Sequence, residues 1–218
     1  MMFRQVLYTQ WKWSAWAVVT TAVAAFTLPL VSVQRAGANT EATDVLYLLG
    51  DVAGVGYMYP FLAVAAGITI ALLTWAPDHA GRHVYALSLP VPRWYYALLR
   101  YGAGTLLLVP TMLALWIGAL VATSSATIPQ GLDAYPTAIA FRFALATLFG
   151  FSMFFALAAG TVRTAIIALG VAPTAIIVTN QIIISFGGPN LVWTALEYLI
   201  RLPGPMELLF EPWMLINV

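Results

Sequence analysis

The sequence predicts an all-α fold, a polytopic integral membrane bundle of about five transmembrane helices. Hydrophobic residues make up 62% of the 218 residues and charged residues only 8%, and the mean hydropathy is +0.90. Because soluble domains carry about 25% charged residues, an ordinary soluble domain is excluded. The apolar residues also fall into blocks of about 20 residues, which is the length that an α-helix needs to cross a bilayer.

The composition excludes several functions. A net charge of +1 gives no case for nucleic-acid binding. Without cysteine, the chain has no disulfide and no thiolate metal site. There is no G-x-x-x-x-G-K motif and the sole lysine is Lys12, so this chain is not a P-loop ATPase. With no G-x-S-x-G and no H-E-x-x-H motif either, we expect no catalytic site and no cofactor in this chain.

The first span is expected at residues 14–33. Its 20 apolar residues exceed the usual length of a signal-peptide core, so we interpret it as a retained helix. Residues 1–13 before it form either a short helix in the membrane interface or a frayed basic N-terminus.

Four further apolar blocks follow along the chain. The connection at 161–164 is so short that the last two spans must be antiparallel neighbours. The expected spans are residues 52–76, 101–122, 138–160 and 165–186.

The charges divide by side in this topology. Six of the nine Lys and Arg residues fall on one side and seven of the eight acids on the other. By the positive-inside rule the basic side is cytoplasmic, which places the N-terminus inside and the C-terminus outside. We expect a bacterial inner (cytoplasmic) membrane. The six basic residues expected inside are Arg4, Lys12, Arg82, Arg93, Arg100 and Arg163.

The last 32 residues lack a sixth span, because charges and prolines interrupt every apolar run. We therefore divide the chain into a transmembrane domain, 1–186, and an external interfacial tail, 187–218. Short helices are predicted at Leu191 to Ile200 and at Met206 to Phe210, and residues 213–216 are expected to lie in the outer membrane interface.

The loop at 77–100 is the one long polar and basic interruption between spans. An acid, Asp78, is followed by Gly-Arg at 81–82, a Leu-Ser-Leu-Pro turn at 87–90 and a basic residue, Arg93. This order resembles the first cytoplasmic loop of ABC-2 type transporter permeases. The resemblance is concentrated in the 27 residues from Asp78 to Gly104. The alternative is an amphipathic loop on the lipid headgroups, anchored by aromatic residues.

The resemblance implies a permease subunit that exports an amphipathic or lipid-like solute. In that family the loop is a coupling helix that docks on a separate cytoplasmic ATPase subunit, which binds the ATP. A homodimer or an assembly with other membrane subunits is implied as well. The missing sixth span departs from the family pattern. The residues expected to contact the ATPase are Asp78, Arg82, Leu87, Leu89, Pro90 and Arg93.

Polar residues inside the spans are the candidates for a substrate path. Asn180 and Gln181 lie at mid-depth in the fifth span, and Arg142 lies one turn into the fourth. Interhelical hydrogen bonds explain Asn180 and Gln181 equally well. Arg142 can extend to the headgroups or pair with Asp133 or Glu197. His79 and His83 are more simply solvated residues than metal ligands, because no third ligand is evident.

A second function is compatible with the same sequence. Spans with few polar residues, a missing sixth helix and an aromatic-rich tail are typical of a non-catalytic structural subunit in a larger membrane complex, such as an energy-transducing or light-harvesting assembly. Co-purification with an ATPase distinguishes the two functions.

Overall fold

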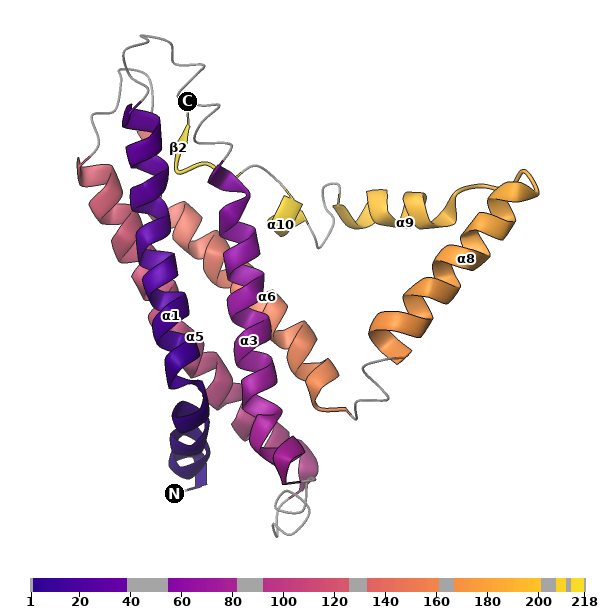
Figure 1. Ribbon diagram of the computed structural model, residues 1–218, viewed down its shortest axis with the longest axis horizontal. Coiled ribbons are helices and arrows are strands. Elements are labelled where there is room, and N and C mark those ends of the chain that lie inside the picture. Colours follow the sequence, from indigo (N-terminus) through magenta and orange to yellow (C-terminus); the bar gives the residue numbers. More distant parts are fainter. Residues whose placement is uncertain are drawn as a thin grey trace. The chain divides into compact units, whose positions relative to one another are not determined.

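The computed structural model describes residues 2–38, 55–81, 92–125, 133–160, 167–200, 207–210 and 213–217. Within this part of the chain, four helices are long and apolar enough to cross a membrane, which is typical of a helical membrane protein. They lie side by side in Figure 1. The four are α1 (Met2–Ala38), α3 (Met58–Ala80), α5 (Arg93–Ser125) and α6 (Pro136–Ala158).

The chain divides into two compact units. Unit 1 is Met1–Phe155 together with Pro212–Val218, and unit 2 is Ala156–Glu211. Residues of the predicted fifth span therefore group with the helices that follow them in unit 2. The four long helices form the core of unit 1.

Helices α1 and α5 run in the same direction along each other. Gln10 Nε2 donates to the carbonyl of Arg100 at 3.3 Å. Eleven residues further along each helix, Thr21 and Thr111 share a hydrogen bond of 2.9 Å. Near the far end, a Cβ at Gly118 would lie 2.3 Å from the Phe26 carbonyl oxygen. A glycine at this position lets the two backbones touch, which is how helices approach in membranes.

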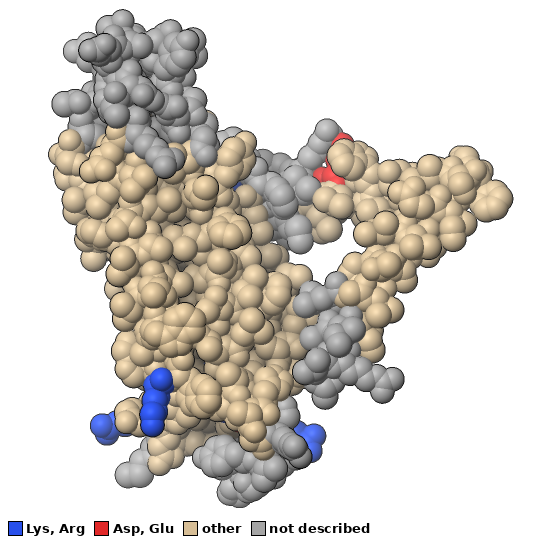
Figure 2. All heavy atoms as spheres, viewed as in Figure 1, with Lys and Arg blue, Asp and Glu red and all other residues tan. Residues whose placement is uncertain are grey.

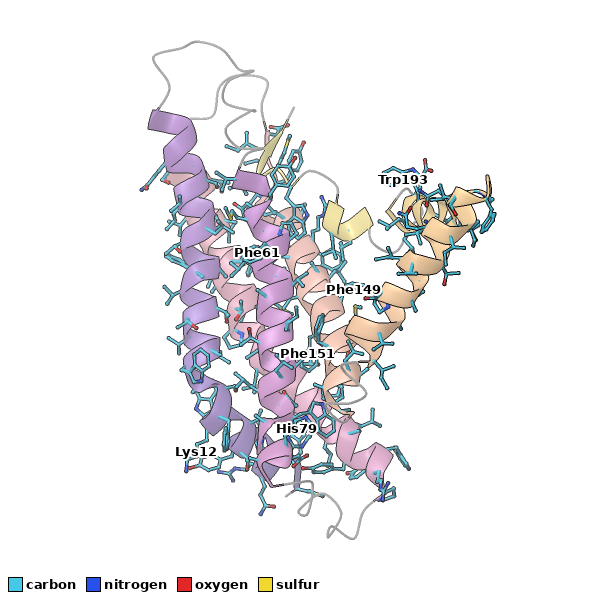
Figure 3. All side chains as sticks on the ribbon, turned by 45° about the vertical axis from the view of Figure 1, so that its right-hand side comes forward. Lys12, Phe61, His79, Phe149, Phe151 and Trp193 are labelled. Atoms are coloured by element: carbon cyan, nitrogen blue, oxygen red, sulfur yellow. The ribbon has the colours of Figure 1, made fainter. Side chains whose placement is uncertain are left out.

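Helices α3 and α6 also meet through small residues. A Cβ at Gly67 would lie 2.6 Å from the backbone of Phe151, and one at Gly150 would lie 3.2 Å from the Val64 Cα. Nearer the end of α3, Trp75 Nε1 donates to the Phe155 carbonyl at 3.2 Å. Phe151 is fully buried in the bundle (Figure 3).

At the end of the bundle where α6 begins, the C-terminus returns and is buried. Strand β1 (Asp133–Ala134) pairs antiparallel with β2 (Ile216–Asn217). Trp213 stacks on Tyr59, with ring centroids 6.2 Å apart. Residues 213–216 were expected at the outer membrane interface, and that position stays a prediction; in the structure Trp213, Leu215 and Ile216 are buried in the protein.

Unit 2 contains short helices. A turn of π-helix, η1 (Ile167–Val171), leads directly into α8 (Ala172–Ser185). Gly187 then adopts a φ of 80°, a left-handed conformation that glycine reaches without steric cost, and the chain turns toward α9. The unit also holds α9 (Leu191–Ile200) and α10 (Glu207–Phe210).

The predicted helices agree with these elements to different degrees. Helix α6 and the two tail helices match within two residues. The first span and the segment before it are one continuous helix, because Gln10 and Ser14 continue the buried face of α1. The loop predicted at 77–100 is helical at both ends, through Ala80 in α3 and from Arg93 in α5. Helix α8 has 14 residues and is shorter than the four long helices, so the count of five spans stays a prediction.

We expect Gly118→Ala to destabilise unit 1 by about 1–3 kcal/mol, because the added methyl group forces α1 and α5 apart. Gly170→Ala is the matched control, since no atom lies within 4 Å of a Cβ built there. The thermal unfolding midpoint of the full chain in detergent measures both. Equal midpoints for the two variants would show that the close approach at Gly118 is not needed.

Candidate functional site

One end of the bundle carries a buried ion pair. Asp78, in the last turn of α3, accepts a hydrogen bond from Arg100 Nη2, in the second turn of α5, at 2.8 Å. The two side chains are only 2% and 6% exposed. We call this end, formed by the start of α1, the end of α3 and the start of α5, the basic end. The Lys and Arg side chains visible in Figure 2 lie there.

Tyr96 completes the ion pair. It lies four residues before Arg100, so both side chains occupy the same face of α5. Arg100 Nη2 donates to Tyr96 Oη at 2.6 Å, and the Tyr96 hydroxyl donates to both carboxylate oxygens of Asp78 at 3.2 Å. We call Asp78, Tyr96 and Arg100 the Arg100 cluster.

The guanidinium of Arg100 has further partners. Its Nη1 donates to the Thr74 carbonyl on α3. Its Cζ atom lies 5.4 Å from the centre of the Trp75 ring and 4.9 Å from that of Tyr96, within the range of cation–π attraction. Only Nε lacks a hydrogen-bond partner among the described residues. The cation is thus held by α3 at three points, Thr74, Trp75 and Asp78.

Helix α1 closes the third side of the cluster. A pocket of about 330 Å³ lies there, and its α1 wall includes Gln5 and Thr9, which are exposed, so the pocket opens to the surface. Among the described lining residues the one cation and the one anion neutralise each other, so together they give the pocket no net charge. The lining residues are Met2, Gln5, Val6, Thr9, Pro77, Asp78, Tyr96 and Arg100.

The Arg100 cluster acts as a joint, because its hydrogen bonds and its ion pair hold α3 and α5 together. Carboxylate, phenol and guanidinium bond to one another, and none of the described residues that line the pocket is His, Cys, Ser or Lys. Among the described residues no group of three His, Cys, Asp or Glu side chains is placed to hold a metal ion. His79 lies exposed at the same end of the bundle as Lys12 (Figure 3). His83 lies outside the described residues.

The residues expected to contact an ATPase divide into three groups. Asp78 has a carboxylate that is buried against Arg100, and its expected contact with an ATPase stays a prediction. Arg93 is exposed in the first turn of α5. Arg82, Leu87, Leu89 and Pro90 lie outside the described residues.

Asn180, one of the expected path residues, holds the turn between α8 and α9. Its Oδ1 accepts the Val192 N–H at 3.0 Å, and its Nδ2 donates to Asn190 Oδ1 at 3.0 Å. Asn190 caps α9 by accepting the Trp193 N–H at 2.9 Å. Asn180 therefore satisfies an amide that the helix start leaves unpaired. The neighbouring Gln181 is exposed.

Arg142 belongs to unit 1 and lies at the end opposite the Arg100 cluster. Its Cζ atom is 4.7 Å from the centre of the Trp213 ring. Since Trp213 in turn stacks on Tyr59, these three side chains fix the returning C-terminus to α3 and α6. The sequence had suggested Asp133 or Glu197 as the partner of Arg142, and the aromatic contact was missed.

The sequence also missed the roles of Tyr96 and Arg100. Two signals could have revealed them. Asp78 is the only acid on the basic side of the expected topology, which marks it as the one residue there that could form an ion pair with a neighbouring cation. The spacing of Tyr96 and Arg100 puts a hydroxyl and a guanidinium on one helix face. What the sequence did not provide was the alignment of α3 with α5.

We expect Arg100→Leu to destabilise the protein by about 3–5 kcal/mol, because it leaves the Asp78 carboxylate buried without a cation. The thermal unfolding midpoint of the full chain in detergent measures this loss. Asp78→Leu combined with Arg100→Leu should recover most of it, since both charges are gone. Arg93→Leu, which removes an exposed cation from the same helix, is the control. A single Arg100→Leu variant as stable as Arg93→Leu would contradict the role given to the ion pair.

We expect Asn180→Leu to loosen the start of α9. Hydrogen exchange at the amides of Val192 and Trp193 should become roughly 2- to 30-fold faster, matching the free energy lost with a helix cap. Gln181→Leu is the control and should leave those amides unchanged. If the amides of Val192 and Trp193 exchange at the same rate in the two variants, Asn180 does not act as a cap, and its role in a substrate path is favoured instead.

Comparison of the chain with protein-family models, with curated proteins and with solved structures finds no match. The function is therefore inferred from the residues and geometry of the chain itself.

Proposed function

We propose that this chain is the membrane-spanning permease subunit of an ABC-2 type transporter. It exports an amphipathic or lipid-like solute and is driven by a separate ATPase subunit that binds residues 82–93. The proposal is supported by the order of residues from Asp78 to Gly104 and by four helices of membrane-spanning length.

The observation that carries the proposal is the position of the Arg100 cluster. Asp78 lies two residues before Ala80, where α3 ends, and Tyr96 and Arg100 lie in the first two turns of α5. The cluster therefore joins the two helices directly beside the segment that connects them. A force on that segment would move α3 and α5 together, because water does not compete for the buried hydrogen bonds that join them. Without this joint, bending of the helix ends would absorb the displacement.

The joint also extends to α1. Gln10 donates to the Arg100 carbonyl and is itself buried, so α1 follows any movement of α5. Close backbone contact at Gly118 carries the same pairing to the other end of the bundle. In the proposed mechanism the ATPase supplies the energy, and the helices tilt as a body to change access to the solute path.

The course of the chain supports a fifth crossing of the membrane. Phe155, near the end of α6, bonds to Trp75 close to the basic end, while Arg142, near its start, lies against Trp213. Between the end of α6 and Trp213 the chain must therefore cover a distance equal to the length of α6, whose 23 residues span about 34 Å. Helices η1 and α8 together provide about 28 Å of this distance from 19 residues. We propose that they form the fifth span, with the basic end in the cytoplasm.

The alternative, a non-catalytic structural subunit of a larger membrane complex, is favoured by the surface of unit 2. Large apolar side chains project from α9 and from the turn before it: Phe186 is 87% and Trp193 65% exposed. Aromatic side chains of this size are enriched where proteins bind one another. Under this alternative, α8 and α9 dock on other subunits, and residues 82–93 transmit no force from an ATPase.

The proposal predicts that Arg82→Glu combined with Arg93→Glu uncouples the two subunits. Transport should fall by about 5- to 150-fold, the usual range of coupling between sites, while ATP hydrolysis and membrane insertion persist. Transport into vesicles that contain the complex is measured beside its ATPase rate. Arg35→Glu, a charge reversal in the last turns of α1, is the matched control.

Purification in mild detergent provides the complementary measurement. An ATPase that co-purifies with the chain supports the permease, whereas a pigmented or redox complex without an ATPase supports the structural subunit. Normal transport by the double variant would remove the coupling role of the loop.

A further inference from the structure

The first turns of α1 present a stripe of basic and aromatic residues to the outside. Arg4, Tyr8, Trp11 and Lys12 are spaced by four, seven and eight residues, so they share one face of the helix. All four are exposed, Tyr8 by 70% and Trp11 by 43%. The buried face of the same turns, which includes Gln10, packs on α5. We call these four residues the α1 stripe.

The positive charge at this end is not compensated within the described residues. Asp78 is the described acid at the basic end, and Arg100 neutralises it. Arg4, Lys12 and Arg93 are exposed and make no ion pair with another described residue. The basic end therefore presents Arg4, Lys12 and Arg93 to its surroundings. Figure 2 shows Lys and Arg side chains on the surface at this end.

Helix α5 adds aromatic residues at the level of the stripe. The contact between Gln10 and Arg100 fixes the alignment of the two parallel helices. Six residues before that contact lie Arg4 on α1 and Trp94 on α5, so these two side chains stand at the same height. Trp94 is 66% exposed, and Arg93 lies beside it. Cations and indole rings therefore share one layer of the bundle.

Above this layer the surface becomes apolar. Val19 and Val23 continue the exposed side of α1 in the direction of the bundle centre. The order along the helix is thus a cation, Arg4, then the rings of Tyr8 and Trp11 together with Lys12, then aliphatic residues. The same order is found across a membrane leaflet, from phosphate through the interface to hydrocarbon.

We propose that the α1 stripe, together with Arg93 and Trp94, binds the headgroups of anionic phospholipids in one leaflet. Arg4 and Arg93 present guanidinium groups that match the geometry of phosphate. Lys12, about 12 Å further along α1 than Arg4, extends its ammonium group from the apolar side back to the headgroups. The aromatic rings and valines require a lipid, because a soluble phosphate compound offers no acyl chains to cover them. This inference does not depend on the transport function.

Native mass spectrometry of the full chain in detergent tests the proposal. The probes are phosphatidylglycerol and phosphatidylcholine with the same acyl chains. The wild-type chain should bind the anionic lipid more tightly. Arg4→Gln combined with Lys12→Gln should weaken this binding roughly 25-fold, at roughly fivefold for each basic residue near a membrane surface, and leave phosphatidylcholine unchanged.

Two further variants separate charge from fold. Arg4→Lys combined with Lys12→Arg keeps both charges and should retain the preference for the anionic lipid. Arg35→Gln removes a cation from the last turns of the same helix and should have no effect. If the first double variant does not fold, the single Lys12→Gln variant should still show the roughly fivefold loss. Equal binding of the two lipids by the wild-type chain, or an equal loss in Arg35→Gln, would overturn the proposal.

Discussion

The buried ion pair between Asp78 and Arg100 is the constraint on which the basic end of the bundle depends. Two charges removed from water are tolerated only where their geometry is good and the remaining bonding groups are satisfied. Here Tyr96, the Thr74 carbonyl and the Trp75 ring provide these contacts, and each comes from α3 or α5. Because the bonds have to be kept, the ends of α3 and α5 are fixed to each other, and Gln10 fixes α1 to both. The ion pair therefore holds α3 and α5 together, and the hydrogen bond of Gln10 adds α1 to them.

The rest of unit 1 is held by contacts of a different kind. Lipid surrounds a membrane helix as readily as another helix does, so association relies on close packing and on hydrogen bonds between helices. Gly67, Gly118 and Gly150 supply the close packing, and each meets the backbone of a neighbouring helix. At the end opposite the ion pair, Arg142 and Tyr59 hold Trp213 between them. The C-terminal segment thus joins α3 and α6 at the end of the bundle opposite the Arg100 cluster.

Much of the helical layout could be predicted from the sequence, because apolar length is a local property. Helix α6 and α9 were found nearly to the residue, since prolines and polar residues mark their starts. The ends of α3 and α5 were assigned to a loop because charge was interpreted as exposure to solvent. Asp78 and Arg100 show why this fails: two opposite charges that pair can continue a helix into the protein interior. The burial of Trp213 was not predictable, because it depends on a strand pairing across more than 80 residues of sequence.

The arginines of this chain also show how far charge counting can be taken. A topology rule weighs Arg4, Arg93, Arg100 and Arg142 equally, yet their surroundings differ. Arg100 adds no net charge to the basic end, because Asp78 cancels it, and Arg142 lies against the Trp213 ring. Among the described residues, the charge that a membrane surface can detect at the basic end comes from Arg4, Lys12 and Arg93. The proposed orientation and the proposed lipid contact therefore rest on the same three side chains, while Arg100 acts inside the protein as a joint.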